Sequence, residues 1–279
     1  RNDVGRAAIF LGRPAPANGN TLVICEADVD LYGEASSSRL GWSVSAVGDL
    51  NQDGCAEAAF GQPELAVDGR TRQGTVRIIY GWGPGCFSEP RMLSLTVNDA
   101  DARFGTSISA ADFDLDGRSD LAIGGFNARV DSERRGVVWI IRASTLDTLG
   151  PRRLDQSTIF HDMSDAVGSQ GEWLIGGPFN LSRFGWSLSA VSEYLLVGIP
   201  RLGEGGDYSG GAYLYKVGVN GVEGIHGIFR GETSIGDGQL GLMVDMYRND
   251  VEAWVGVGSL WGRGNQTQGG SVYVGQFTP

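Results

Sequence analysis

Two acidic segments of the sequence have side chains and a spacing that suit a metal ion. The first reads "DLNQDGCAE" and carries oxygen-bearing side chains at its first, third, fifth and ninth positions, which are Asp49, Asn51, Asp53 and Glu57. The second reads "DFDLDGRSD" and carries them at the same positions, which are Asp112, Asp114, Asp116 and Asp120. We call residues 49–57 the first acidic loop and residues 112–120 the second acidic loop.

Calcium is the ion that this pattern favours. Ca²⁺ takes six to eight oxygen ligands in a flexible shell, and alternate residues of a tight loop can converge on one point. The seventh positions, Cys55 and Arg118, would each contribute a backbone carbonyl. Gly54 and Gly117 stand where each loop must turn sharply. We therefore expect two Ca²⁺ sites.

Two alternatives apply to these loops. An EF-hand begins in the same way, but it closes with Glu at position twelve and lies between helices. Here each loop closes at position nine and runs into a strand-like segment, "AAFG" or "LAIG". A simple acidic turn is the other alternative, because Asp, Asn and Gly dominate turns. Carboxylates crowded into one turn repel each other, so a cation is the better explanation.

The elements that would position these loops come from a fourfold repeat. The strand entries are "RLGWSVSAV" from Arg39, "RFGTSISAA" from Arg103, "RFGWSLSAV" from Arg183 and "QLGLMVDMY" from Gln239. Each is followed by two further apolar runs of five to eight residues, and some repeats add a fourth, such as "RMLSLTV" and "HGIFRGE". The small residues of the entry strands suit an inner strand where sheets converge. The pattern is typical of propeller blades.

The fold class that follows is all-β. We predict a single propeller domain or propeller segment over residues 1–279, with repeats near 39–98, 103–160, 183–232 and 239–276. "GRAAIFLG" from Gly5 is expected to be a third strand, with "TLVICEAD" as its fourth. Residues 143–182 are irregular, and "GEWLIGGP" there resembles a second strand. We interpret that segment as a reduced fifth blade, the alternative being an insertion.

The acidic loops and strand entries resemble the FG-GAP repeat of integrin α-subunit propellers. The residues that carry the resemblance are "FG" or "LG", a Ser-rich strand and then "GDLNQDGCAEAAFGQP". The resemblance covers roughly residues 1–142 and 183–276. It implies four-stranded blades, structural calcium between the first two strands of a blade, and ligands on the opposite face or at blade junctions. Propellers of that family have seven blades, so about four to five blades here imply that the ring closes on N-terminal strands, belongs to a larger ring, or assembles with other chains.

Several classes of function are disfavoured. The net charge is −11 with one lysine, whereas nucleic-acid binding needs clustered basic residues. The two histidines, His161 and His226, lie in no catalytic motif, and no G-x-S-x-G, H-E-x-x-H or phosphate-binding loop occurs. No apolar run is long enough to span a membrane. We expect a protein without catalytic residues.

The cysteines and two glycosylation triplets bear on where the protein works. Cys25, Cys55 and Cys86 allow one disulfide at most, and the sequence does not say which, or whether all three are free. "NLS" at Asn180 and "NQT" at Asn265 are acceptor patterns for N-glycans in a secreting eukaryote. With the resemblance, they point to an extracellular or cell-surface protein.

The sequence therefore predicts an extracellular, calcium-stabilised binding or adhesion module with a protein or glycan ligand on a loop face. A lectin-like propeller is one alternative, since tryptophans can stack on sugars. We expect Trp42, Trp139, Trp186 and Trp254 to pack between blades instead, and Trp82 and Trp261 to be the exposed candidates. A structural subunit that joins other chains through incomplete terminal blades is the second alternative.

Overall fold

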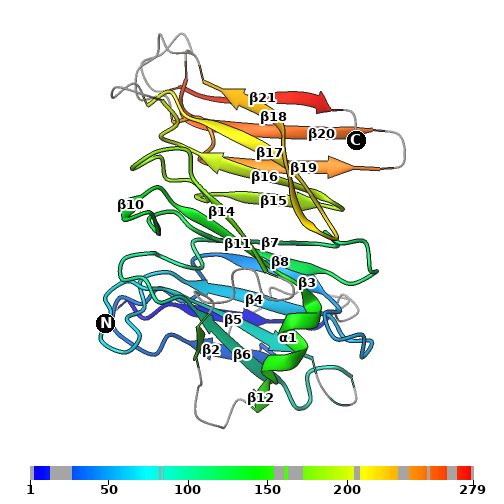
Figure 1. The fold of residues 1–279 in the computed structure, drawn as a ribbon. Coiled ribbons are helices and arrows are strands. Elements are labelled where there is room, and N and C mark those ends of the chain that lie inside the picture. The colour runs from blue at the N-terminus through cyan, green and yellow to red at the C-terminus, as the bar shows by residue number, and fades with distance from the viewer. Residues whose placement is uncertain are drawn as a thin grey trace, which may run out of the picture.

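The computed structural model describes residues 3–12, 27–81, 83, 85–153, 160–162, 172–203, 208–231, 239–249, 252–262 and 269–277. These residues form a series of small antiparallel sheets stacked side by side, as Figure 1 shows. The all-β class and the blade-like sheets predicted from the repeats are thus confirmed. No helix in this described part of the chain has the length and apolar character needed to cross a bilayer.

Three complete blades have four strands each. The first contains β3 (Val44–Gly48), β4 (Glu57–Gln62), β5 (Thr75–Tyr80) and β6 (Arg91–Thr96). The second contains β7 (Ser107–Ala111), β8 (Asp120–Gly125), β11 (Val137–Ile141) and β14 (Glu172–Gly176). The third contains β15 (Leu188–Val191), β16 (Tyr194–Ile199), β17 (Gly211–Gly218) and β18 (Gly221–Arg230).

Two partial sheets flank the three blades. The fourth blade has three described strands, β19 (Met243–Arg248), β20 (Ala253–Gly262) and β21 (Gly269–Phe277). At the other end, β1 (Arg6–Ile9) pairs with β2 (Val29–Tyr32) as a hairpin beside the first blade. β1 is the expected third strand, but its described partner is "VDLY", and most of the expected "TLVICEAD" strand lies outside the described residues.

The irregular segment between the second and third repeats is not a reduced blade, so that interpretation was wrong. β14 pairs with β11 and completes the second blade as its outer strand. Between them the chain forms α1 (Ala143–Leu149) and then β12 (Arg152–Arg153) and β13 (Phe160–Asp162), which both pair with β6 of the first blade. The segment is an insertion that extends the neighbouring sheet before the second blade is finished. A short hairpin of β9 (Arg129–Val130) and β10 (Glu133–Arg134) lies between β8 and β11.

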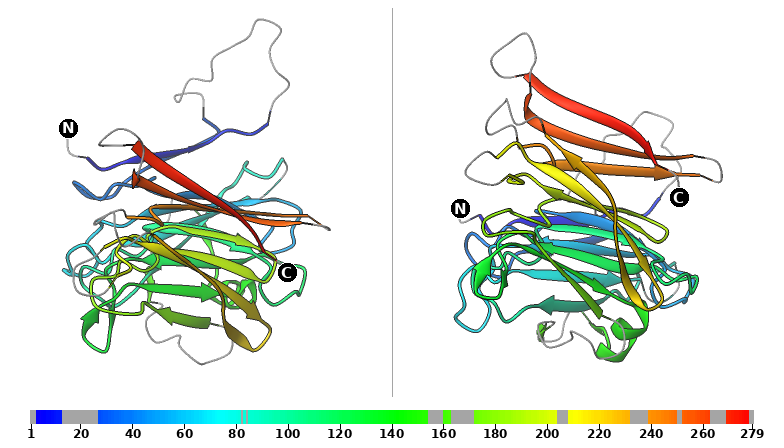
Figure 2. Two further views of the ribbon diagram at one scale, coloured as in Figure 1. Left: turned by 90° about the horizontal axis from the view of Figure 1, so that it is seen from above. Right: turned by 45° about the horizontal axis from the view of Figure 1, so that its top comes forward.

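The inner strands β3, β7, β15 and β19 contact one another in this order. Figure 2 shows the successive sheets turned relative to each other about this line of inner strands. In three repeats the serine two residues after the motif glycine bonds the next blade: Ser43 Oγ donates to Gly105 O (2.8 Å), Ser107 Oγ to Gly185 O (2.8 Å) and Ser187 Oγ to Gly241 O (2.9 Å). The small residues of the repeat thus allow the blade backbones to approach closely.

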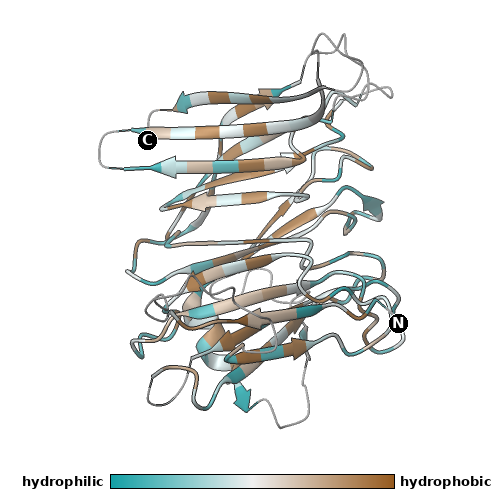
Figure 3. Cartoon of the chain, turned by 180° about the vertical axis from the view of Figure 1, so that it is seen from behind, coloured by the Kyte–Doolittle hydropathy of each residue, from teal (hydrophilic) through white to brown (hydrophobic). Residues whose placement is uncertain are grey.

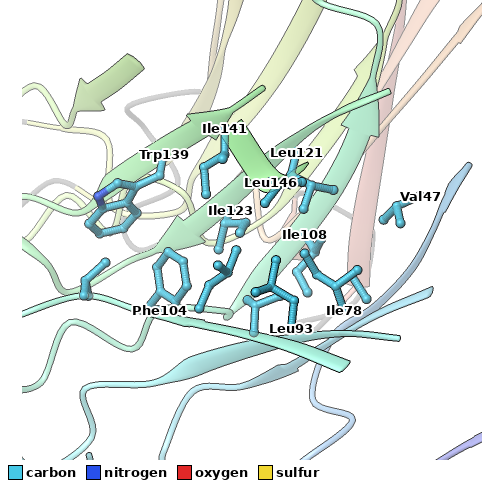
Figure 4. Close-up of a cluster of buried hydrophobic side chains, with 14 of the residues drawn as sticks. Val47, Ile78, Leu93, Phe104, Ile108, Leu121, Ile123, Trp139, Ile141 and Leu146 are labelled. Atoms are coloured by element: carbon cyan, nitrogen blue, oxygen red, sulfur yellow. The ribbon is translucent and has the colours of Figure 1, made fainter. Parts of the chain in front are cut away.

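Each hydrophobic core lies between consecutive blades. Between the first and second blades, Phe104 is fully buried and its ring meets Trp139 edge-on at 5.1 Å (Figure 4). Phe104 and Phe184 occupy the apolar position before the motif glycine, and both are 0% exposed. Burial of such aromatic side chains supplies much of the stability of a blade junction. Brown segments mark the apolar runs of the strands in Figure 3. The central strands β5, β8 and β11 are buried at every residue, as expected where both faces of a sheet are covered by its neighbours.

Candidate metal-binding loops

Each acidic loop connects the first two strands of its blade. The first follows β3 and enters β4, and the second follows β7 and enters β8. Their glycines, Gly54 and Gly117, have φ of +88° and +90°, a left-handed conformation that glycine adopts without steric cost. The resemblance placed the loops at this point of the blade, and the structure agrees.

Side-chain oxygens fold each loop around itself in the same way. Asp49 accepts hydrogen bonds from the amides of Asp53 (3.1 Å) and Gly54 (2.9 Å). Asp112 accepts them from the amides of Asp116 (3.0 Å) and Gly117 (2.8 Å). The third position behaves alike, because Asn51 and Asp114 accept from the residue two positions later. Two loops of different sequence thus share one geometry.

The convergence of carboxylate oxygens makes both loops candidates for a metal. Ligand atoms of Asp49, Asp53 and Glu57 lie within 4.8 Å of one another, and so do those of Asp112, Asp114 and Asp116. Of the sequence-predicted set, these six are brought together as two acidic triads. Asn51 contributes its amide oxygen within the first loop. The predicted roles of the Cys55 and Arg118 carbonyls stay predictions.

The ninth residue of each loop is buried under its turn. Glu57 Oε2 accepts the Leu50 amide (2.6 Å), and Asp120 Oδ2 accepts the Phe113 amide (3.1 Å). Asp120 Oδ1 also accepts the Ala143 amide at 3.0 Å. Glutamate is one methylene longer than aspartate, which lets the Glu57 carboxylate reach the other acids of its loop. Asp120 is anchored by both oxygens and stands outside the second triad.

Glu57 has an oxygen that a cation would satisfy. Its Oε1 is buried and has no hydrogen-bond partner of normal geometry in the described part of the chain, although the Gly81 amide is near enough to lower its pKa. Burial, and then the charges of Asp53 and Asp49, raise the pKa of Glu57 to about 8. Burial raises the pKa of Asp120 to about 7, and Asp114 adds to that rise. Without a cation, these buried carboxylates are poorly compensated, so the oxygen-rich loops fit a hard divalent ion.

A disulfide and an arginine hold the first loop in place. Cys55, at the seventh position, is bonded to Cys86 in the connection between β5 and β6, which selects one of the pairings that the sequence left open. Arg118, at the seventh position of the second loop, donates from Nε to Leu50 O at 2.9 Å and pairs with Asp147 at 2.8 Å. The two loops are therefore adjacent across a blade junction.

The third repeat has an ion pair where the first two have acidic loops. β15 and β16 are joined by Ser192 and Glu193 alone. Arg248 of the fourth blade donates to Glu193 Oε2 at 2.8 Å. A residue of the next blade thus reaches back to the turn at this junction too.

Comparison with known proteins agrees with the repeat. The FG-GAP repeat profile matches residues 104–141, which span the second blade from Phe104 to the end of β11. Phosphatidylinositol-glycan-specific phospholipase D of Rattus norvegicus is 31% identical over 202 residues, covering 68% of this chain and 22% of that protein. The Homo sapiens protein of the same name is 29% identical over 204 residues, covering 69% and 23%. This chain therefore spans about a fifth of the length of these relatives.

Integrin α chains are also similar over shorter regions. Integrin alpha-5 of Xenopus laevis is 38% identical over 113 residues, which is 39% of this chain and 10% of the integrin. Integrin alpha-IIb of Mus musculus is 29% identical over 153 residues, which is 53% and 14%. The predicted relationship to integrin α propellers is thus confirmed, and a relationship to the phospholipase D proteins is added to it.

Proposed function

The chain belongs to the FG-GAP repeat family, and on that premise we propose that it is a non-catalytic, extracellular binding or adhesion module stabilised by two calcium ions. The observation that carries the proposal is the pair of acidic triads at equivalent points of two adjacent blades. Both lie at one end of the inner strands, so the loops at the other end remain available for a ligand.

The first ion would be held by Asp49, Asn51, Asp53, the Cys55 carbonyl and Glu57. The second would be held by Asp112, Asp114, Asp116, the Arg118 carbonyl and Asp120. When bound, each ion supplies positive charge that offsets the acidic loop and ties the turn to the strand behind it. The chain's own contribution is to gather oxygens on two tight turns and to hold the first of these turns by Arg118 and the disulfide.

An extracellular location is supported by the disulfide, because such bonds persist in oxidising compartments. The similarity to integrin α chains supports a binding role. The phospholipase D relatives are enzymes by name, but the aligned region is only about a fifth of their length. Their activity therefore does not transfer to this chain by alignment alone.

Calcium titration into chelator-treated protein tests the metal part of the proposal. We expect two calcium ions per chain by calorimetry and a higher melting temperature; at a hundredfold excess over Kd, each site adds about 2.7 kcal/mol of stability. Asp53→Asn should remove one site, whereas Asp68→Asn, an exposed acid outside both loops, should remove none. No calcium binding by the folded chain would contradict the proposal.

Binding of the labelled chain to cell surfaces tests the rest. We expect binding that needs calcium and is abolished by chelator. Release of a phosphatidylinositol-glycan anchor by the chain alone would contradict a non-catalytic role.

A further inference from the structure

A pocket of about 430 Å³ lies at the end of the inner strands opposite the acidic loops. Residues just before β3, β7 and β15 line it, whereas the acidic loops follow β3 and β7. Three blades contribute to it, with four arginines, Arg39, Arg103, Arg183 and Arg201. We call it the arginine pocket. Its one carboxylate is Glu64, so the lining is strongly positive in a chain whose net charge is −11.

Three of these arginines occupy one repeated position, two residues before the motif glycine. Arg39, Arg103 and Arg183 have φ of 58°, 58° and 59°. A non-glycine residue rarely adopts this left-handed conformation, and Gln239 adopts it at the same position of the fourth strand entry with φ of 50°, so the conformation belongs to the repeat. The strand entry thus holds the backbone so that the same side chain of each blade lines the pocket.

A second repeated position sets the charge beside each arginine. Glu64, Asn127 and Arg201 each follow the second strand of their blade by the same number of residues. Glu64 pairs with Arg103 of the next blade, and its Oε1 lies 3.9 Å from Arg39 Nη1. The equivalent residue is a neutral amide at the next junction and a further arginine at the third. Positive charge therefore accumulates around Arg183 and Arg201.

Arg201 offers a donor that the described part of the chain does not use. Its Nε is buried and has no hydrogen-bond partner among the described residues. Its guanidinium lies over the Tyr208 ring at 5.2 Å, which orients the group without using its N–H donors. Leaving a buried charged donor unpaired is costly, and an oxyanion would satisfy it with a charge-assisted bond.

Aromatic rings stand next to the guanidinium groups. Arg39 stacks over Trp42 at 5.4 Å and Arg183 over Trp186 at 5.3 Å. Trp42 is 50% exposed and Trp254 is 37% exposed, so the expectation that they pack between blades was wrong, whereas Trp139 is buried as expected. An exposed Trp42 ring and a half-buried Trp186 ring beside positive charges suit a ligand with an apolar ring face and an anionic substituent.

The volume of the pocket and the net charge of the chain restrict the class of ligand further. The volume is at the small end of the range for small-molecule pockets. The net charge of −11 disfavours a long polyanion, which would extend beyond the positive lining of the pocket. It disfavours a compact anion less.

We propose that the arginine pocket binds an anionic sugar residue, with Arg183 and Arg201 donating to its carboxylate, sulfate or phosphate and the sugar ring lying against Trp42 or Trp186. This inference rests on the proposed binding function and names the ligand class of the face opposite the calcium loops. The three oxyanions share one chemistry, so the experiment distinguishes among them.

Calorimetric titration of the calcium-loaded chain tests this proposal. The ligands are glucuronic acid, glucose 6-sulfate, glucose 6-phosphate and uncharged glucose. We expect at least one anionic sugar to bind about tenfold or more tightly than glucose. Arg201→Gln should weaken that binding about tenfold. Arg153→Gln removes the same charge from an exposed pair with Glu89 and should leave the affinity unchanged.

Folding of each variant is checked by its calcium-dependent melting. If Arg201→Gln does not fold, a competition experiment on the unsubstituted chain takes its place. Inorganic sulfate should then displace the bound anionic sugar. Preference for an acidic peptide over all three sugars would overturn the ligand class while leaving the binding function intact. Equal affinity for glucose and the anionic sugars, or no binding to a chain that still binds calcium, would overturn the inference without touching the calcium sites.

Discussion

Arg118, in the second acidic loop, donates from Nε to the carbonyl oxygen of Leu50 in the first acidic loop over 2.9 Å. The Leu50 amide in turn donates to Glu57. A side chain of the second blade is therefore one residue away from a predicted calcium ligand of the first. The two loops form one structure that spans a blade junction.

Arg118→Gln should weaken calcium binding at the first loop, although Arg118 belongs to the second. The substitution leaves the carbonyl of the buried Leu50 without its donor, which costs about 1–3 kcal/mol. Calorimetry in an Asp116→Asn background, where the second site is disabled, isolates the affected site. Arg129→Gln, which breaks a more exposed ion pair with Asp99, is the control and should change little. An unchanged first-site affinity would show that the loops act separately.

Two substitutions in the second loop should separate metal binding from folding. Asp116 is exposed, so Asp116→Asn should reduce calcium affinity while the metal-free chain keeps its melting temperature. Asp120 is buried and accepts two backbone amides. Asp120→Asn points an NH₂ group at one of them and should destabilise even the metal-free chain by about 1–3 kcal/mol. Thermal melts in chelator distinguish the two, and equal melting temperatures would contradict the assignment.

The third blade should show an acid-sensitive junction that does not depend on calcium. Partial burial would raise the pKa of Glu193, but hydrogen bonds from Ser192 and Arg248 outweigh it and lower that pKa below its ordinary value. A carboxyl with a lowered folded-state pKa contributes stability above its ordinary pKa of 4.5, and that contribution is lost as pH falls through the folded value. Glu193→Gln should therefore cost about 1 kcal/mol at pH 7 and progressively less as the pH falls through the folded-state pKa of Glu193. Chemical denaturation at a series of pH values from 7 down to 3 in chelator measures this, and a cost that stays constant over the series would rule it out.

The disulfide should support the first loop selectively. Cys86→Ala opens the bond to Cys55 and should lower stability by about 2–4 kcal/mol. Because Cys55 lies within the first loop, calcium affinity should fall there and stay constant at the second. Cys25→Ala leaves the bond intact and serves as the control. Site-resolved calcium titration decides, and equal losses at both loops would argue for a global effect only.

The glycine of a blade's second strand that faces the next blade, such as Gly124 in β8, should be indispensable at the blade junction. A Cβ on Gly124 would lie 2.1 Å from Gly185 O of the next blade, whereas one on Gly256 would meet nothing closer than 3.9 Å. Gly124→Ala should thus destabilise by about 3 kcal/mol or more, and Gly256→Ala by much less. Denaturant unfolding of the two variants provides the comparison. Similar stabilities would mean that the blades can shift apart freely.

The sequence predicts well the features that depend on residues close together along the chain. Each acidic loop has its oxygens within nine residues, and three of the four strand entries repeat the same glycine and serine, so spacing alone indicates the turn and the strand. β14 was misassigned because α1, β12 and β13 stand between it and its partner β11, and pairing across such an insertion leaves no local signal. The sequence could not assign the Cys55–Cys86 disulfide because three cysteines allow three pairings.

Sequence reasoning missed the arginine pocket, although the repeated arginines that line it are visible in the sequence. Arg39, Arg103 and Arg183 begin three of the four strand entries, and their recurrence two residues before the glycine has no role in strand formation. Only the arrangement of blades shows that residues 64 and 144 positions apart along the chain line one pocket. Long-range convergence of this kind is a property of the packed blades and not of any single repeat.

The residue after the second strand varies among Glu64, Asn127 and Arg201, while the backbone around it keeps the same course. The charge of the arginine pocket and the packing of the blade junctions are therefore set by separate positions of the repeat. A single codon change at this position would alter the electrostatics of one junction without touching the glycines and serines that join the blades. Duplication of such a unit yields a scaffold on which new ligand preferences can evolve at little cost to stability.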